Sequence, residues 1–319
     1  MRTFLRLDDL RDFVPAHFGS DRRLVALDRL TGGTKKGVYR LRLDDDTTAV
    51  LYVWADDENY WPPAEVVPDD PFTDADGAEL FEVNHAALAA AGVRVPEMMF
   101  MDRAAGLALV EDAGTRFLAG LMADDPAAAE APLARLGAAL RRMHTTAGPQ
   151  YGKLAVIARG AASPDRLPED VIEDRALRHL DAVATRDGRM ADGRHRIADH
   201  VAGLRATVTA RHEYGLVHGE LGPDHVLVTA AGEPVMIDIE GLAYFDVEWD
   251  HAWIQMRFGD AYPRLDPVEL DPDRLEFYRY AQVLSLIEGP LRIAGTDFPE
   301  REWMLGLAEW NIGKALAAL

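Results

Sequence analysis

Short runs of branched and aromatic residues dominate the first hundred positions of the chain. They occupy residues 24–30, 37–43 and 47–54, and the acidic triplet 44–46 separates the last two. Such runs, bounded by turn-forming residues, are typical of strands, so the pattern predicts a β-meander. Between the first two runs lies TGGTKKG (31–37), a loop with three glycines. Residues 78–92 then show helical spacing that ends at Gly92, and residues 93–102 and 106–112 predict two further strands.

Helical spacing prevails from about residue 113 to residue 215. The clearest amphipathic segment is 133–144, and further helices are predicted at 169–186 and 194–213. A hairpin follows, with strands at 225–229 and 234–240 around the turn 230–233, and residues 273–293 return to helix. The pattern predicts an α+β protein with two lobes. The N-lobe, residues 1–111, holds an antiparallel sheet and one helix, and the C-lobe, residues 112–319, is mainly helical.

Composition narrows the range of partners and sites. The chain has 319 residues and no cysteine, which excludes disulfides, thiolate nucleophiles and cysteine-ligated zinc. Its formal net charge of −20 disfavours nucleic acid and anionic membranes as partners and favours a cationic ligand, although an acidic surface also serves solubility alone. No uncharged apolar run reaches 18 residues, and the first residues carry acids where a signal peptide needs an apolar core. We therefore expect a cytoplasmic protein.

The hairpin carries the strongest chemical signal. The loop HGELGPDHVLV (218–228) contains His218, Glu220 and His225, and the returning strand brings Asp238 beside them. Carboxylate and imidazole groups at one point suit a Mg²⁺ ion whose other ligands are water and phosphate. The glycine loop 31–37 is a second candidate, because glycines let backbone N–H groups approach phosphates. Such loops are common, so only the combination of loop and hairpin indicates a phosphate site.

These motifs resemble a known superfamily. HGELGPDHVLV followed by VMIDIEG (235–241) is similar to the catalytic loop and metal-binding strand of the aminoglycoside phosphotransferase and choline kinase-like superfamily, whose pattern is His-Gly-Asp, four residues, Asn, then Ile-Asp. The segments AAAGVRVP, ALVEDAG, LRRMH and FDVEWD follow in the family's order. The resemblance implies a bilobal protein-kinase-like fold. It also implies ATP-dependent (or GTP-dependent) phosphoryl transfer to a hydroxyl with Mg²⁺ as the metal, and the imidazole of His225, a softer ligand than an amide oxygen, favours Mn²⁺ somewhat over Mg²⁺.

The resemblance also assigns roles by position. Glu220 takes the place of the catalytic base, with His218 bracing the loop beside it, and His225 and Asp238 take the places of the metal ligands. The nucleotide-binding positions are Gly32, Gly33, Lys35, Lys36, Tyr52, Glu82, Glu111 and Asp112. In the same way, Asp246 and Asp250 resemble a structural pair that ties the catalytic loop down, with Asp250 assigned mainly to support.

Three positions depart from the family pattern. Glu220 stands where the family has Asp and reaches one methylene farther, which displaces a base unless the loop has moved. His225 stands where the family has Asn, as in macrolide phosphotransferases, and the alternative is that it only caps the loop. Tyr52 stands where a strand lysine is expected, and residues 47–54 contain no base. Either Lys35 or Lys36 supplies the missing charge, or nucleotide binding is weak and Glu82 is only a solvated helix residue, with Glu79 as the second choice for the lysine's partner.

Two classes of function remain open at this point. The leading interpretation is a phosphotransferase whose acceptor is a hydroxyl of an antibiotic-like molecule, a metabolite or a peptide Ser or Thr. The alternative is a catalytically impaired kinase-like module that binds or scaffolds through a partner. A weaker third idea is transfer of another part of the nucleotide, such as the adenylyl group. The sequence fixes neither the acceptor nor the oligomeric state.

Overall fold

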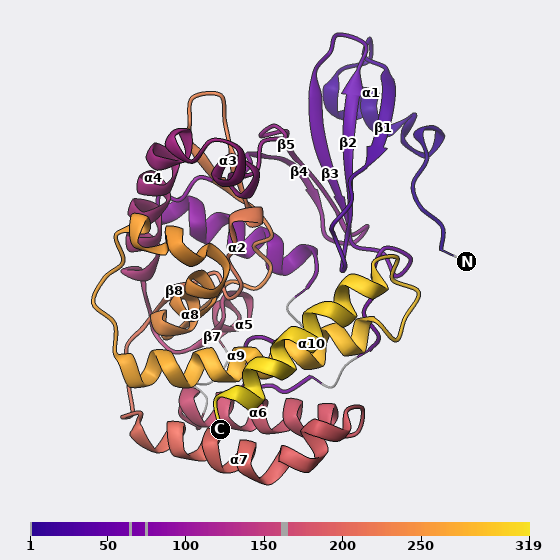
Figure 1. Cartoon of the computed structure of the whole chain (residues 1–319). Helices are drawn as coiled ribbons and strands as arrows, with labels where there is room; N and C mark the ends of the chain where they lie inside the picture. Colours follow the sequence, from indigo (N-terminus) through magenta and orange to yellow (C-terminus); the bar gives the residue numbers. More distant parts are fainter. Residues whose placement is uncertain (1, 64–65, 74–75, 161–164) are drawn as a thin grey trace.

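A computed structural model describes residues 2–63, 66–73, 76–160 and 165–319. Five antiparallel strands form a sheet in the order β1-β2-β3-β5-β4 (Figure 1). Their bounds are β1 Leu24–Arg29, β2 Gly37–Leu43, β3 Thr48–Val53, β4 Met98–Asp102 and β5 Leu107–Glu111. Helix α2 (Ala78–Ala90) lies between β3 and β4 in the chain. The predicted β-rich N-terminal part and helical C-terminal part are confirmed, whereas the division at residues 111 and 112 stays a prediction.

Both faces of the sheet are covered, which explains why β3 is apolar almost throughout. Leu51 and Val53 face a cluster that includes Leu10 and Val14, from the 3₁₀ turn η1 (Leu7–Leu10) and helix α1 (Phe13–Phe18). Tyr52 points to the other face, where its ring packs edge-on against Phe81 of α2 at 5.3 Å between centroids. Side chains alternate across a strand, so position 52 belongs to the core between the sheet and α2.

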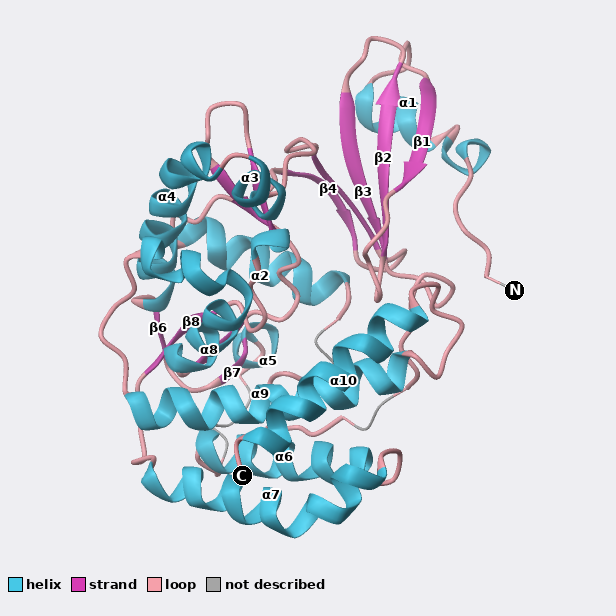
Figure 2. Cartoon of the chain, viewed as in Figure 1, coloured by secondary structure: helices cyan, strands magenta, loops and turns pink. Residues whose placement is uncertain are grey.

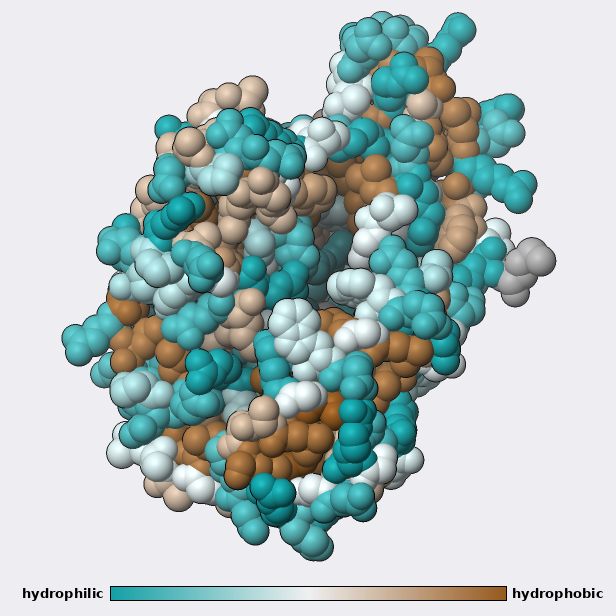
Figure 3. Space-filling view, viewed as in Figure 1, coloured by the Kyte–Doolittle hydropathy of each residue, from teal (hydrophilic) through white to brown (hydrophobic). Residues whose placement is uncertain are grey.

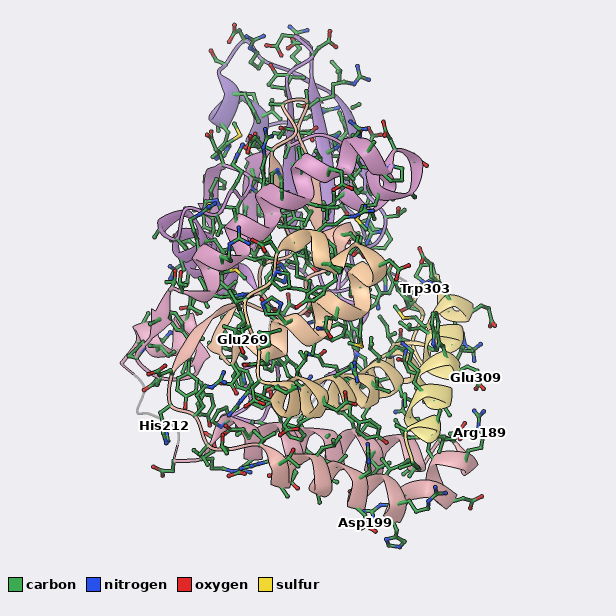
Figure 4. All side chains as sticks on the ribbon, turned by 60° about the vertical axis from the view of Figure 1, so that its left-hand side comes forward. Arg189, Asp199, His212, Glu269, Trp303 and Glu309 are labelled. Carbon is green, nitrogen blue, oxygen red and sulfur yellow. The ribbon has the colours of Figure 1, made fainter. Side chains whose placement is uncertain are left out.

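The C-terminal part is built around helix α9 (Pro272–Ile293). It packs against α6 (Pro168–Ala184), α7 (Gly188–Thr207), α8 (Val247–Phe258) and α10 (Arg301–Ala317) (Figure 2). Arg189 on α7 and Glu309 on α10 form an ion pair of 2.7 Å on the outer surface (Figure 4). In the described part of the chain, no helix is both long and apolar enough to cross a membrane. The helices are α3 Leu118–Asp124, α4 Pro126–His144, α5 Leu154–Ala158, α6 Pro168–Ala184, α7 Gly188–Thr207, α8 Val247–Phe258, 3₁₀ turn η3 Gly259–Leu265, α9 and α10 Arg301–Ala317.

Two helices differ from their predicted bounds by six or seven residues at an end, for local reasons. Helix α4 begins at Pro126 rather than 133 because the Asp125 side chain accepts a hydrogen bond from Ala128 N and so caps an earlier start. Helix α7 begins at Gly188 rather than 194 because Asp187 caps it in the same way. It ends at Thr207 rather than 213, where Val208 adopts an extended conformation within a β-branched run that favours strand over helix.

Short strands frame the predicted hairpin. The strands β6 (Ala147–Gly148), β8 (Tyr214–Val217), β11 (Ala243–Phe245) and β7 (Gly152–Lys153) form one small sheet, and β9 (Val226–Val228) pairs with β10 (Pro234–Met236). The predicted strand 234–240 ends at Met236, so its extension was wrong. Asp238 has φ = 59°, a left-handed conformation that costs energy in a residue other than glycine and recurs at functional sites. The chain therefore turns at Asp238.

Candidate functional site

A buried carboxylate holds the loop after β8 in place. Asp250 of α8 accepts hydrogen bonds from the backbone N–H of His218 at 2.9 Å and of Gly219 at 2.8 Å. His144 Nε2 lies 3.0 Å from the same carboxylate. Burial opposes ionisation, but the hydrogen bond from His144 and the neighbouring groups hold the pKa of Asp250 below its ordinary value. The expected supporting role of Asp250 is confirmed, whereas Asp246 binds Arg274 and Tyr278 instead.

The side chain of His218 is buried beneath the loop and does not reach the solvent. Its side chain is fully buried, and Nε2 donates a hydrogen bond of 3.1 Å to the carbonyl of Ile237. Burial, assisted by the nearby His225, lowers the pKa of His218 below its ordinary value. A neutral imidazole that donates to the segment carrying Asp238 braces the two segments against each other.

Lys36 is the residue of the glycine loop that enters the site. Its ammonium group lies 2.7 Å from Asp238 Oδ1 and 2.7 Å from Glu240 Oε1, and the lysine is 9% exposed. Burial disfavours the ammonium ion, but the charges of Asp238 and Glu240 outweigh it and raise the pKa of Lys36 above its ordinary value. The charge of Lys36 in turn lowers the pKa of Asp238 well below its ordinary value. Lys36 and Asp238 are therefore both ionised at neutral pH.

His225 faces the same carboxylate from the hairpin side. Its Nε2 is 3.7 Å from Asp238 Oδ2, too far for a hydrogen bond. Its Nδ1 is buried without a hydrogen-bond partner among the described residues. The imidazole and the carboxylate thus face each other without a hydrogen bond, and both are groups that can bind a metal.

These side chains fit a divalent cation. The ammonium of Lys36 already occupies the point where Asp238 and Glu240 converge, which shows that this point attracts positive charge. Both oxygens of Glu240 are buried, and within the described residues neither accepts a well-directed hydrogen bond. No group of three or more His, Asp and Glu among the described residues forms a complete protein site. A Mg²⁺ ion at this point would take its remaining ligands from phosphate and water, as Mg²⁺ usually does.

Glu220 lies at the solvent-exposed mouth of the same cluster. Its side chain is exposed, and a methyl group placed on Gly241 would lie 3.9 Å from Glu220 Oε1. Gly241 directly follows Glu240, so the carboxylate at the predicted base position faces the segment that carries the predicted metal ligand Asp238. An accessible carboxylate beside the metal-compatible cluster can accept a proton from an incoming hydroxyl.

The structure separates Glu82, a predicted nucleotide-binding position, from the site and keeps Tyr52, another, beside it. Glu82 forms an ion pair with Arg103 rather than with either loop lysine. Tyr52 lies under Lys36, with the ammonium 5.4 Å from the ring centroid, so the lysine from the loop sits above the position where the strand lysine was expected. Burial raises the pKa of Asp76 above its ordinary value, and the nearby charge of Lys35 acts in the opposite direction.

The remaining predicted positions lie in the glycine loop and at the hinge. Gly32 has φ = 103°, and a Cβ on Gly33 would meet Lys36 O at 2.8 Å, so both positions need glycine. At the hinge, Arg94 pairs with Glu111 at 2.6 Å. Arg40 pairs with Asp112 at 2.7 Å. Their side chains are thus engaged within the protein, which leaves the hinge backbone as the group to test for base recognition.

Sequence reasoning missed Asn84. The residue is fully buried on α2, and its Nδ2 donates to the carbonyls of Ile239 at 2.8 Å and Glu240 at 3.1 Å. It therefore joins α2 to the segment that carries Asp238. The available signal was a polar residue within the apolar stripe of Phe81 and Leu88, since buried amides need hydrogen-bond partners.

A hollow adjoins this cluster. The surface between the sheet and the helical part is recessed and lined with hydrophilic residues (Figure 3). A cavity of about 650 Å³ lies among the start of α2, the β4–β5 turn and α5. Asp76 lines this cavity, and the charges of Lys35, Glu240 and Lys36 are near enough to affect its pKa. The cavity therefore borders the cluster. Its Arg103 and Arg159 pair with Glu82 and Glu79, so its lining is charge-balanced rather than strongly acidic.

Solved structures share this architecture. The choline kinase LicA from Streptococcus pneumoniae aligns with a TM-score of 0.64 and 12% identity over 98% of this chain and 99% of that chain, and LicA is also known in complex with AMP. A thermostable mutant of the aminoglycoside phosphotransferase APH(4)-Ia, in ternary complex with ADP and hygromycin B, gives a TM-score of 0.60 and 17% identity over 95% and 98%. Macrolide 2'-phosphotransferase type I gives 0.61 and 15% over 97% and 98%. At these identities the likeness shows the fold.

The sequence itself gives the family. A search among curated proteins finds no significant match. The model of the phosphotransferase enzyme family, however, matches residues 26–284, which include the glycine loop, the hinge, the catalytic loop and the segment around Asp238. The chain therefore belongs to the phosphotransferase enzyme family.

Proposed function

We propose that the protein transfers the γ-phosphate of ATP, or of GTP, to a hydroxyl of a small molecule. One observation carries the proposal. A lysine of the glycine loop meets the carboxylates of Asp238 and Glu240 at 2.7 Å each, beside His225 and Glu220. Phosphoryl transfer needs positive charge on the phosphates, a metal site and a group that accepts the hydroxyl proton. This cluster contains a candidate for each.

The residues would take different roles according to their charge and position. Asp238 and His225, with Glu240 beside them, would hold a divalent metal, whose charge offsets that of the phosphate oxygens when it is bound. Lys36 would then bind phosphate oxygens in place of the carboxylates, which supplies the positive charge that Tyr52 does not. Glu220 would take the proton of the acceptor hydroxyl, and His218 and Asp250 would keep the loop in place.

The acceptor is a hydroxyl-bearing small molecule. The net charge of −20 favours a cationic acceptor in general, but the charge-balanced lining of the adjoining cavity does not select one. Complexes of structural neighbours with AMP, and with ADP and hygromycin B, support a nucleotide and an alcohol as partners. The peptide acceptor and the cytoplasmic location stay predictions.

Calorimetry with ATP and GTP tests the nucleotide site, first with Mg²⁺ and then with Mn²⁺. We expect metal-dependent binding in the micromolar range. A panel of alcohols, including aminoglycosides, macrolides and choline, is then screened for conversion of the nucleoside triphosphate to the diphosphate. Phosphorus NMR identifies the phosphorylated product. Absence of binding with either metal refutes the proposal and favours the binding or scaffolding module.

A further inference from the structure

The glycine loop is fastened at Thr34. The Thr34 carbonyl accepts a hydrogen bond of 2.8 Å from Tyr60 N, and Thr34 Oγ1 accepts one of 2.8 Å from the indole Nε1 of Trp61. Glycine-rich loops are conformationally free unless such contacts restrain them. Thr34 is two residues before Lys36, so its position limits where the ammonium can reach.

The segment that holds Thr34 is itself anchored on the C-terminal helices. The indole ring of Trp61 lies against Gly289 of α9, where an added Cβ would be 3.4 Å from Trp61 Cη2. The guanidinium of Arg292, also on α9, lies 4.8 Å from the centroid of Trp61. Next to it, the ring of Tyr60 packs against Phe298 at 5.3 Å. Through Trp61 the glycine loop is thus linked to α9.

We infer that Trp61 is a positioning residue that clamps the glycine loop to α9 and thereby keeps Lys36 above Asp238. A lysine on β3 would be fixed by the sheet itself, with its hydrogen bonds on both sides. A lysine on a loop has no such support, so a loop that supplies this charge needs a second anchor. The consequence for nucleotide binding rests on the proposed function, whereas the clamp itself does not.

The clamp is tested in the protein without nucleotide. Trp61→Phe keeps an aromatic ring against Gly289 and Arg292 but removes the indole N–H, and Thr34→Val removes the side-chain acceptor while keeping the residue's shape. Amide hydrogen exchange across residues 31–37 should become about fivefold to tenfold faster in either variant, the value of one hydrogen bond. The double variant should be no faster than the single ones, because both remove the same bond. Trp303→Phe, at an exposed position of α10, is the matched control and should leave the loop unchanged.

A second readout separates positioning from general damage. If the nucleotide site is active, Trp61→Phe should raise KM for the nucleotide about fivefold and leave kcat close to that of the parent. Exchange in residues 31–37 that is equal in the parent, Trp61→Phe and Thr34→Val overturns the clamp, whatever the protein binds. Faster exchange in the two variants, together with a parent protein that binds no nucleotide, would keep the clamp and refute the proposed function alone.

Discussion

Lys36 and Asp238 are 202 positions apart in the chain, and their Nζ and Oδ1 atoms are 2.7 Å apart. The ammonium also contacts Glu240, so it lies where a divalent cation would bind. A metal that binds here without nucleotide must therefore displace the ammonium group of Lys36. Nucleotide phosphates offer Lys36 a new partner, which makes joint binding of metal and nucleotide easier than binding of the metal alone.

Lys36→Met should separate these two effects. Without the ammonium, Asp238 and Glu240 lose their counter-ion, so Mn²⁺ alone should bind about tenfold more tightly or better, as measured by electron paramagnetic resonance. Affinity for the metal–nucleotide complex should fall about tenfold to a hundredfold, because a charge-assisted hydrogen bond to phosphate is lost. Lys35→Met is the matched control from the same loop and should change both affinities less. Unchanged Mn²⁺ affinity in Lys36→Met would contradict the competition.

Asp238→Asn should remove the dependence of nucleotide binding on metal. The variant keeps the shape of the side chain but loses the charge that the metal needs, and metal ligands of Mg²⁺ are chiefly carboxylate oxygens. Calorimetry with ATP should show the same weak affinity with and without Mg²⁺. Asp224→Asn, at an exposed acid of the loop before β9 that pairs with Arg257, should bind as the parent does. Full metal dependence in Asp238→Asn would place the metal elsewhere.

Glu220 tests whether the longer side chain is used. Glu220→Gln should lower turnover by at least about a hundredfold with little change in nucleotide affinity, the size expected for loss of a general base. Metal-dependent hydrolysis of ATP, with water as acceptor, provides the assay before the alcohol is known. Glu220→Asp restores the family's residue but withdraws the carboxylate by one methylene, so in this loop it should also lose activity, by roughly 10²-fold. Turnover retained in Glu220→Gln would end the assignment of the base.

Local patterns predicted much of the fold and part of the site. Runs of branched and aromatic residues located β1, β2 and β3, and helical spacing located α2, each within a few residues, because both faces of the sheet and one face of α2 are buried. The motif 218–225 located the loop, and Asp250 was placed correctly as its anchor. The strands, the helix and the loop motif are short segments whose neighbours in sequence are also neighbours in space, whereas the role of Asp250 came from the resemblance to the family.

Contacts between distant segments were harder to predict. The sequence offered Lys35 and Lys36 equally, and only the tertiary structure shows which ammonium meets Asp238. Glu82 was preferred on α2 because it is charged, yet the helix turns Asn84 towards the site and Glu82 towards Arg103. The end of β10 at Met236 was also missed, since the left-handed turn at Asp238 occurs at a non-glycine residue and has no sequence signal.

Asp250→Asn should destabilise the protein by about 2–4 kcal/mol. The carboxylate accepts from two backbone N–H groups and lies against His144, all of them buried. The amide of Asn turns an NH₂ group towards one of these donors and leaves it without an acceptor, and an unsatisfied buried donor near a lost charge costs this much. Urea unfolding followed by circular dichroism gives the value. Asp199→Asn, on the exposed face of α7, is the control and should change stability by less than about 0.5 kcal/mol (Figure 4).

His251 should make the protein sensitive to mild acid. Burial, together with the nearby His144, lowers the pKa of His251 to about 4 from 6.5, while Asp250 acts in the opposite direction. A hydrogen bond of 3.0 Å joins the Tyr262 hydroxyl and His251 Nδ1. The unfolded chain takes up a proton below pH 6.5 and the folded chain only near pH 4, so unfolding binds protons and stability falls as pH falls through this window. At about 1.4 kcal/mol for each pKa unit, the loss approaches 3 kcal/mol near pH 4.

His251→Phe isolates this contribution from that of the other buried histidines. The variant removes the titrating group and keeps a ring at the same place, so its free energy of unfolding should change less with pH than that of the parent. We expect the difference between parent and variant to shift by up to about 3 kcal/mol between pH 7 and pH 4, in favour of the variant at low pH. The exposed His212 (Figure 4) is the control, because His212→Phe should follow the parent's pH dependence. Parallel curves for parent and His251→Phe would show that burial does not hold His251 in its neutral form.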